Sequence, residues 1–141
     1  MRGGIFAAGA FLLVSGICLF VGCGGGEVVE GPETVPVKGK VEFTKGGKDQ
    51  SLAGAVAVEF QSVEKPELLA LGEILEDGTF TLATQVEGKG KPGVVPGTHR
   101  VRLNADESIE RYVSRKFLKH ETSGITVKVP VEGELIIKVW K

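Results

Sequence analysis

Cysteine is scarce in this chain of 141 residues and is confined to its beginning, where Cys18 and Cys23 stand. No disulfide can join two parts of the chain beyond residue 23, so a folded domain there depends on its hydrophobic core. Residues 35–141 supply 107 positions (141 − 34), and a domain of that size buries about 65% of its unfolded surface. One independently folding domain is therefore expected after residue 34.

An excess of charge of one sign is also absent. The chain carries 17 Lys and Arg against 18 Asp and Glu, a formal net charge of -1, and no basic cluster stands out. Proteins that bind nucleic acids usually present a basic face, so we expect no nucleic-acid partner.

Residues that commonly perform catalysis or bind metals are few. The two histidines, His99 and His120, are expected at exposed strand and loop positions, and a metal site usually needs three or more suitably spaced ligands. No Gly-x-Ser-x-Gly nucleophile motif is present. We therefore predict no enzyme activity, no metal and no cofactor. A hydrolase with one of the two histidines as its base is the alternative.

What the sequence does contain is a long uncharged run near its start. Arg2 precedes residues 5–21, which carry no charge, and Gly22-Cys23 follows. A charged start, an apolar run and a small residue before the cut define a secretory signal. The Phe20-Val21-Gly22-Cys23 segment resembles a bacterial lipobox, in which the cysteine takes a diacylglyceryl group and a peptidase cuts before it. Phe20 stands where that pattern usually has Leu.

Cleavage between Gly22 and Cys23 divides the chain into a lipoprotein signal peptide (1–22), a flexible Gly-rich acidic tether (23–34) and a domain (35–141). Acylated Cys23 is then predicted to hold the domain at a membrane of a bacterial cell envelope, outside the cytoplasm, because each buried methylene contributes ~0.8 kcal/mol. Two alternatives remain open. One is an ordinary cleaved signal that releases a soluble domain. The other is an uncleaved single-span helix, since the seventeen residues 5–21 are at the lower limit for a ~30 Å hydrocarbon core.

From residue 35 onward, apolar side chains recur at every second position, which is the period of a strand. Asp77-Gly78 signals a hairpin turn, because this dipeptide tolerates the positive φ of tight hairpins, and Gly46-Gly47 and Glu132-Gly133 are further turn signals. We predict an all-β fold, a Greek-key β-sandwich of two sheets with about seven strands. The strands are expected near residues 35–43, 56–61, 70–75, 79–83, 100–103, 125–130 and 134–139.

Two segments interrupt this alternation. In residues 106–119, apolar side chains fall at helix-like spacing, which predicts a short helix or a pair of turns that caps one end of the sandwich. Residues 87–98 are rich in Gly, Pro and Lys, which predicts an exposed and mobile loop.

Three residues are candidates for contact with a ligand. Lys89 and Lys91 lie in the predicted 87–98 loop, and loops on a rigid scaffold often bind partners, although a plain connection is the alternative. Trp140 falls on the face opposite to the apolar side chains of residues 134–139, where it either stacks on a sugar or closes an edge of the sandwich. The cations between residues 100 and 119 could attract anionic lipid or polysaccharide, but interspersed acids favour a mixed-charge surface.

Several segments, taken in order, resemble a group of planctomycete-type lipoproteins with a carboxypeptidase-regulatory-like, transthyretin-like domain. They are Val35-Pro36-Val37-Lys38-Gly39-Lys40-Val41, Leu52-Ala53-Gly54-Ala55, Glu76-Asp77-Gly78-Thr79-Phe80, Pro96-Gly97-Thr98-His99-Arg100-Val101, and Tyr112 with Thr122-Ser123-Gly124-Ile125-Thr126-Val127. The family's usual Pro-Pro-Gly is Val95-Pro96-Gly97 here. The resemblance implies a seven-stranded Greek-key sandwich without enzymatic activity.

The function expected from these observations is that of a membrane-anchored, non-catalytic lipoprotein with a structural or adhesive domain at the cell envelope. Its first partner is the lipid membrane, which it meets through acylated Cys23. The alternative is a surface module that binds a carbohydrate, such as an envelope polysaccharide, or an envelope protein. Fold alone does not decide between these two roles.

Overall fold

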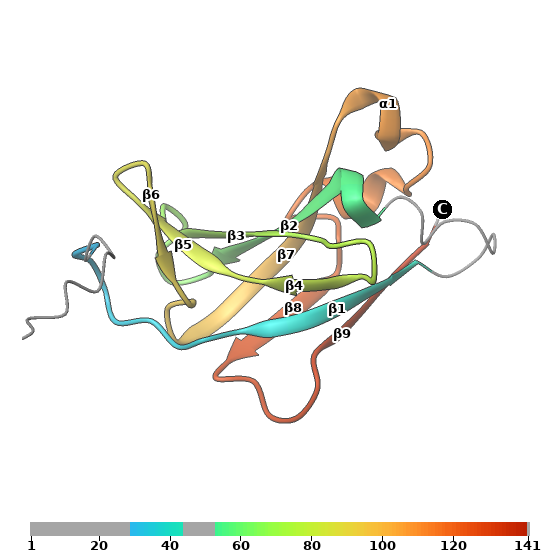
Figure 1. The fold of residues 1–141 in the computed structure, drawn as a ribbon. Coiled ribbons are helices and arrows are strands. Elements are labelled where there is room, and N and C mark those ends of the chain that lie inside the picture. The colour runs from blue at the N-terminus through green and yellow to red at the C-terminus, as the bar shows by residue number, and fades with distance from the viewer. Residues whose placement is uncertain (1–28, 44–52, 141) are drawn as a thin grey trace, which may run out of the picture.

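Alternating apolar side chains give most strands one buried face, and two sheets close over these faces (Figure 1). The computed structural model describes residues 29–43 and 53–140. One sheet has the strand order β4-β1-β9 and the other has the order β6-β5-β3-β2-β7-β8. The strands are β1 (Lys38–Phe43), β2 (Val56–Ser62), β3 (Leu69–Glu73), β4 (Thr79–Thr81), β5 (Ala83–Val86), β6 (Lys89–Pro92), β7 (Gly97–Ala105), β8 (Ile125–Val129) and β9 (Ile136–Val139).

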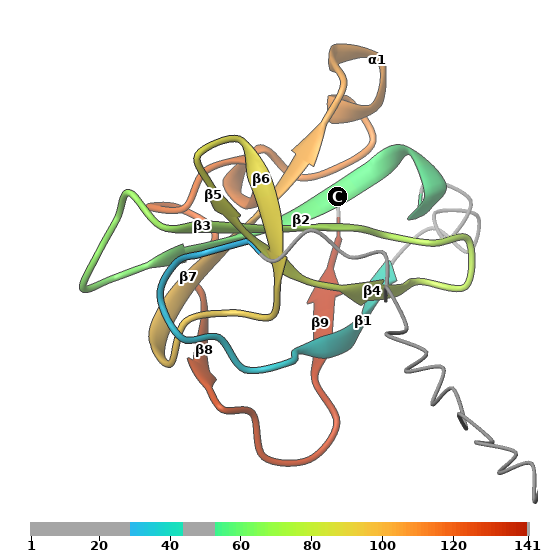
Figure 2. The ribbon, with the colours of Figure 1, turned by 60° about the vertical axis from the view of Figure 1, so that its left-hand side comes forward.

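The predicted all-β sandwich is confirmed. Figure 2 separates β1, β4 and β9 from β2, β3 and β5, which belong to the second sheet. β7 returns past β5 and β3 to pair with β2, a connection of Greek-key type. The described residues hold nine strands instead of about seven, because the predicted strand 79–83 is two strands that meet at Leu82 and because β6 lies inside a predicted loop.

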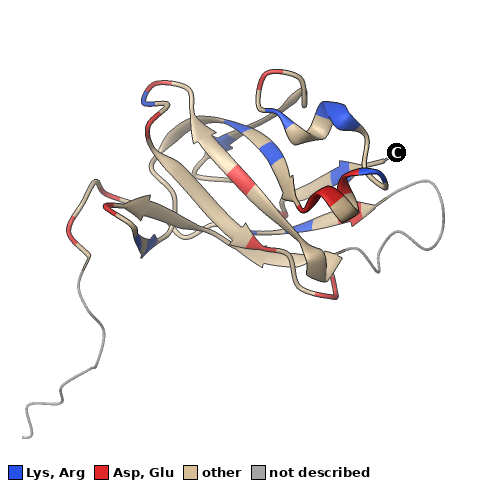
Figure 3. Ribbon diagram, turned by 90° about the horizontal axis from the view of Figure 1, so that it is seen from above, with Lys and Arg blue, Asp and Glu red and all other residues tan. Residues whose placement is uncertain are grey.

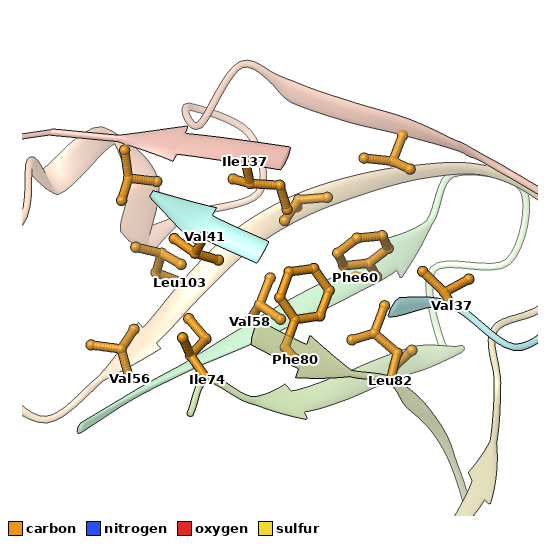
Figure 4. Close-up of a cluster of buried hydrophobic side chains, with 14 of the residues drawn as sticks. Val37, Val41, Val56, Val58, Phe60, Ile74, Phe80, Leu82, Leu103 and Ile137 are labelled. Carbon is orange, nitrogen blue, oxygen red and sulfur yellow. The ribbon is translucent and has the colours of Figure 1, made fainter. Parts of the chain in front are cut away.

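The core contains side chains from both sheets (Figure 4). Val56, Val58 and Phe60 of β2 are at most 2% exposed, as their alternation predicts. The rings of Phe60 and Phe80 come from opposite sheets, and their centroids lie 6.3 Å apart. Burying each such side chain stabilises the fold by about 1.5–3 kcal/mol. The ring of Phe80 also packs on Gly39 of β1, where an added Cβ would lie 2.5 Å from its Cζ atom.

The Asp77-Gly78 turn is present, but the predicted hairpin pairing is wrong. The Gly78 amide donates to the Leu75 carbonyl at 2.8 Å, and Gly78 has a φ of 86°. Asp77 Oδ1 accepts hydrogen bonds from the hydroxyl and the amide of Thr79, and these two bonds lower the pKa of Asp77. The flanking strands lie in different sheets: β3 pairs with β2 and β5, whereas β4 pairs with β1. The turn therefore carries the chain from one sheet to the other.

The prediction of a loop over residues 87–98 is wrong, because the segment contains a strand, although residues 87–90 are exposed as expected. β5 and β6 form a hairpin in which Val86 pairs with Lys89, so that Glu87 and Gly88 make a two-residue turn. Both turn residues have positive φ, 49° and 79°, which is the conformation of a type I′ turn. Val94, near the end of the predicted loop, is fully buried. The Gly and Lys residues of the segment have low strand propensity, so no sequence signal indicated a strand that pairs with β5 through its backbone.

Contacts with the sandwich begin at Gly31, four residues before the predicted domain start at Val35. The Lys91 ammonium donates to the Pro32 carbonyl at 2.8 Å and to the Gly31 carbonyl at 3.3 Å. The Thr34 hydroxyl donates to the Pro92 carbonyl at 2.7 Å. Val35 and Val94 then exchange two backbone hydrogen bonds of 2.8 Å each. Residues 31–35 are thereby held along the β5–β6 hairpin.

The interruption at residues 106–119 contains two short helical turns, as predicted. α1 spans Glu107–Glu110 and a 3-10 turn spans Arg115–Leu118. Val113 and Phe117 are at most 4% exposed and join the core cluster, so the connection closes one end of the sandwich. In Figure 1, α1 lies at the end opposite to the β5–β6 hairpin.

Candidate functional site

The indole ring of Trp140 lies in a cluster of one cation and two aromatic rings. Trp140 directly follows β9 and is 36% exposed. Its ring centroid lies 4.8 Å from that of Phe117, at an interplanar angle of 86°. The Lys116 ammonium lies 3.9 Å from the Trp140 ring centroid and 4.7 Å from that of Phe117. We call Lys116, Phe117 and Trp140 the Trp140 cluster.

The chain holds this cluster from two sides. Phe117 is 1% exposed and anchors the 3-10 turn in the core, which fixes the neighbouring Lys116. The Ser114 amide donates to the Trp140 carbonyl at 3.0 Å, which ties the end of β9 to the same connection. An edge-to-face aromatic pair contributes about 0.5–1.5 kcal/mol beyond its buried area, and an exposed cation–π contact about 0.5–1 kcal/mol. The ring is therefore preorganised, with part of its surface open to solvent.

Charge around the cluster is mixed but locally segregated. The stretch 111–119 contains four cations and no acidic residue, whereas α1 carries Glu107 and Glu110. Figure 3 shows acidic positions on α1 and basic positions on the connection that follows it. On this connection, Tyr112 is 41% exposed and the Arg111 guanidinium lies 4.8 Å from its ring centroid. An exposed cation–π pair thus lies near an aromatic cluster in sequence.

The structure does not bring the three predicted contact residues together. Lys89 and Lys91 lie on β6, and Figure 1 places β6 and the C-terminal end at opposite ends of the molecule. Lys91 is engaged with the carbonyls of Gly31 and Pro32, so it serves the fold. Trp140 lies in a cluster of aromatic and cationic groups.

A buried ion pair on the outer face of the larger sheet was missed by the sequence argument. Glu59 is only 5% exposed, although the alternation of β2 directs it away from the core. The Arg102 guanidinium makes a bidentate interaction with the Glu59 carboxylate, with hydrogen bonds from Nε to Oε1 at 2.9 Å and from Nη2 to Oε2 at 3.1 Å. Arg102 also donates through Nη1 to the Leu118 carbonyl at 3.2 Å, so the connection before β8 covers the pair. No periodicity in the sequence signals this coverage.

His120 lies beside the same carboxylate. Its Nε2 atom is 3.3 Å from Glu59 Oε1 without hydrogen-bond geometry, and its side chain is 9% exposed. Burial lowers the pKa of His120, while the negative charge of Glu59 opposes that shift. An open groove of about 350 Å³ adjoins His120 and is lined by Arg100, His120, Glu121, Gly124, Ile125 and Thr126. Because Arg102 is paired with Glu59, Arg102 does not contribute a free positive charge to the basic surface that the sequence suggested.

The prediction that both histidines are exposed is wrong. His99 is 2% exposed, on the inner face of β7, and its ring lies 6.1 Å from that of Phe60. Its Nε2 atom is 2.7 Å from the Val95 carbonyl, so Nε2 carries the proton and donates it. The Nδ1 atom is buried without a hydrogen-bond partner. Strand alternation, which also directs Val101 and Leu103 inward, is the signal that could have placed His99 in the core.

Metal binding finds no support in the described part of the chain. Residues 29–43 and 53–140 contain no group of three or more His, Cys, Asp or Glu side chains placed to hold an ion. A second hollow, of about 440 Å³, is lined by small residues at the start of β2 and just before it, by Ala105, and by Glu73, Asn104 and Asp106. Two carboxylates without a third ligand do not make a metal site.

The predicted lipidation and cleavage residues, Cys23 and Gly22, lie outside the described residues, as does the turn signal Gly46-Gly47. Within the described ranges, no helix has the length and apolar character needed to cross a membrane. No protein-family model, no curated protein and no solved structure matches the chain. Its function is therefore inferred from its own residues and geometry.

Proposed function

We propose that this chain is a bacterial lipoprotein whose non-catalytic β-sandwich has a structural or adhesive role at the cell envelope. The observation that carries the proposal is the order of Arg2, the uncharged residues 5–21 and Gly22-Cys23, followed by a folded domain within a few residues. The likeness of its segments to planctomycete-type lipoproteins with a transthyretin-like domain supports the same proposal. Acyl chains on Cys23 would hold the protein at the membrane.

The contacts of residues 31–35 support a fixed orientation of the anchored domain. Gly31 lies eight positions after Cys23 (31 − 23), and this stretch can span at most about 29 Å when fully extended. Gly31 lies against the β5–β6 hairpin, so this hairpin would be the end nearest the membrane. The Trp140 cluster, at the opposite end, would point away from it.

The positions of His99 and His120 also support the proposal of a non-catalytic domain. His99 is enclosed in the core and donates to a backbone carbonyl, and His120 is covered beside the Glu59–Arg102 pair. A general base must reach the proton that it abstracts from a substrate. The His99 ring is enclosed in the core, and although His120 borders the groove, its Nε2 atom is buried.

Intact mass spectrometry tests the anchor directly. The protein is extracted from bacterial membranes beside two matched variants, Cys23→Ala and Cys18→Ala. We expect loss of residues 1–22 and added acyl mass in the unmodified chain and in Cys18→Ala, and neither change in Cys23→Ala. A full-length, unacylated mass in the unmodified chain would overturn the proposal in favour of an uncleaved span.

The Trp140 cluster favours a second candidate function, a module that binds an acidic polysaccharide of the envelope. Trp140 is partly exposed and an indole ring can stack on a sugar, while the Lys116 ammonium, which lies over this ring, can pair with the sugar's carboxylate. The cluster's position away from the predicted anchor leaves it accessible to such a polymer.

This second candidate is tested by binding of the full chain to polygalacturonate, with a neutral glucan as the reference polymer. We expect Trp140→Ala and Lys116→Ala to weaken binding at least about tenfold, a loss of roughly 1.4 kcal/mol for each. Lys89→Ala, on the opposite end, is the control and should bind as the unmodified chain does. Equal binding by all variants, or a preference for the neutral polymer, would exclude the site.

A further inference from the structure

We propose that the parallel pair β1–β9 is a mechanical clamp, which lets the domain carry tension between its N-terminal side and the Trp140 end. The inference rests on the anchored structural or adhesive role proposed above, because that role determines where a pull enters the domain. It adds a load-bearing function to that role.

The clamp begins with the register of the two strands. Lys40, Val41, Glu42 and Phe43 of β1 pair in parallel with Ile136, Ile137, Lys138 and Val139 of β9. The backbone amide of Lys40 donates to the Leu135 carbonyl at 2.9 Å at the start of this ladder. Parallel strands have evenly spaced, slanted hydrogen bonds, so a load along the strands is shared by successive bonds of the ladder.

The direction of the strands decides how the ladder is loaded. β1 starts at the end of the sandwich where residues 31–35 lie along the β5–β6 hairpin, and β9 finishes at the opposite end (Figure 1). A pull on the N-terminal side and an opposite pull at Trp140 therefore slide β1 past β9 along their common axis. All four register pairs resist this sliding together, and they must break nearly at once.

β1 is also held along its other edge, whereas β9 is an edge strand of this sheet and is held by its inward side chains. On its other edge β1 pairs with β4, and the Val41 amide donates to the Gly78 carbonyl at 2.8 Å. The inward side chains of Val41, Ile137 and Val139 are at most 3% exposed (Figure 4 labels the first two). Water is therefore kept from one face of the ladder, which slows its exchange into broken hydrogen bonds.

The far end connects a bound partner to β9. Trp140 follows β9 without a gap, and its carbonyl and ring are fixed by Ser114 and by the other members of the Trp140 cluster. A partner that gripped this cluster would pull on β9 along the strand. Tension would then pass from the anchor through β1 to β9 and on to the partner.

Single-molecule force spectroscopy tests the clamp with two pulling directions on the full chain in detergent. One handle is a C-terminal tag, and the other is a single thiol in a Cys18→Ser, Cys23→Ser background. The thiol is placed by Glu33→Cys, ahead of β1, or by Glu76→Cys, in the turn that precedes β4; both positions are exposed. The Glu33 handle shears β1 against β9, whereas the Glu76 handle lies at the same end as the C-terminus and peels β9 away pair by pair.

We expect a rupture force several-fold higher with the Glu33 handle than with the Glu76 handle. Equal forces in the two directions would overturn the clamp. Two matched substitutions locate the resistance: Ile137→Val trims β9, and Ile74→Val trims an equally buried side chain outside the pair. Ile137→Val should lower the shear force more than Ile74→Val, and an equal loss would mean that the whole core resists, which also contradicts the clamp.

The outcome is separate from that of the anchor experiment. The thiol background abolishes acylation at Cys23, so rupture forces report on the β-sandwich alone. Absence of acyl mass on the unmodified chain would remove the anchor and leave the clamp standing. Equal rupture forces would remove the clamp and leave the lipoprotein standing.

Discussion

Glu59 and Arg102 form a pair whose two partners differ in their access to water. The Glu59 side chain is 7% exposed and that of Arg102 is 32% exposed. Arg102→Met would leave the Glu59 carboxylate without its cationic partner in a covered site. Removing one partner of a buried pair costs about 3–5 kcal/mol of stability. Glu59→Gln leaves a guanidinium that water can reach, so a cost of about 1–2 kcal/mol is expected.

Urea unfolding followed by Trp140 fluorescence measures both losses. The double variant Glu59→Met/Arg102→Met is the control, since replacing a buried pair by apolar side chains is often close to neutral. We expect it to be more stable than Arg102→Met alone. Equal losses in the two single variants would contradict the proposed asymmetry.

His120 should make stability depend on pH. Burial holds its folded pKa below the ordinary value of 6.5, against the attraction of Glu59 and Glu121 and together with the repulsion of Arg102. The unfolded chain therefore binds more protons at this site, and the unfolding free energy falls as the pH drops through about 6.5 towards the folded pKa.

The comparison of the unmodified chain with His120→Gln isolates this effect, because His99 is present in both. Urea midpoints measured from about pH 7.5 to about pH 5.5 should fall more steeply for the unmodified chain. A variant that keeps the full slope, or an unmodified chain that gains stability on acidification, would show that His120 is not the responsible group.

At this scale, the sequence predicted the inward side chains well and the covered polar ones poorly. Alternation placed Val58 and Phe60 in the core, and the structure agrees. The same alternation placed Glu59 in solvent, because it has no information about the connection that folds over the outer face near Leu118. Burial of a charged residue by a distant segment is a tertiary effect, and local patterns do not encode it.

The β5–β6 hairpin is the element that offers a gain in stability. Glu87 adopts a φ of 49°, and a left-handed conformation costs most non-glycine residues roughly 1–2 kcal/mol. Asn tolerates this conformation and is favoured before Gly in type I′ turns. We therefore expect Glu87→Asn to raise the unfolding free energy by about 0.5–1 kcal/mol.

Glu87→Ala is the matched control for this gain, because it also removes the charge but has no preference for positive φ. Denaturation by urea compares the two with the unmodified chain. If Glu87→Ala is stabilised as much as Glu87→Asn, the effect comes from the lost charge and the turn argument fails.

Elements with a strong local sequence signal were predicted correctly. Features that depend on which strands pair with each other were not. The Asp77-Gly78 turn and the two helical turns of residues 106–119 follow from local residue preferences. Which sheets the turn joins is set by β1, whose backbone pairs with β4. β6, with the sequence Lys-Gly-Lys-Pro, has low strand propensity. It forms because the tight turn that precedes it brings its backbone into antiparallel pairing with β5.

The boundary between tether and domain can be measured on the whole molecule. Thr34, Val35 and Lys91 join residues 31–35 to the sandwich, so a protease should be unable to cut there in the folded state. We expect the N-terminus of the protected species to lie at or before Gly31, as read by mass spectrometry after limited proteolysis.

The variant Lys91→Ala provides the control, because it removes both hydrogen bonds to Gly31 and Pro32 but leaves the Val35–Val94 bridge. Its protected N-terminus should move toward Val35. A protected species that starts beyond Val37 in the unmodified chain would mean that residues 31–35 are not held.

The pairing of β1 with β9 also sets the order of events in time. Phe43 and Val139 are partners although they lie 96 positions apart in the chain (139 − 43), so the three-stranded sheet can close only after β9 has been synthesised. Closing so long a loop is slow, and ribosomes add only about 5–20 residues per second. A nascent chain that lacks β9 therefore cannot complete the three-stranded sheet for a time on the order of seconds. For a protein exported as proposed above, that delay would let the translocation machinery engage the first residues before the sandwich is complete.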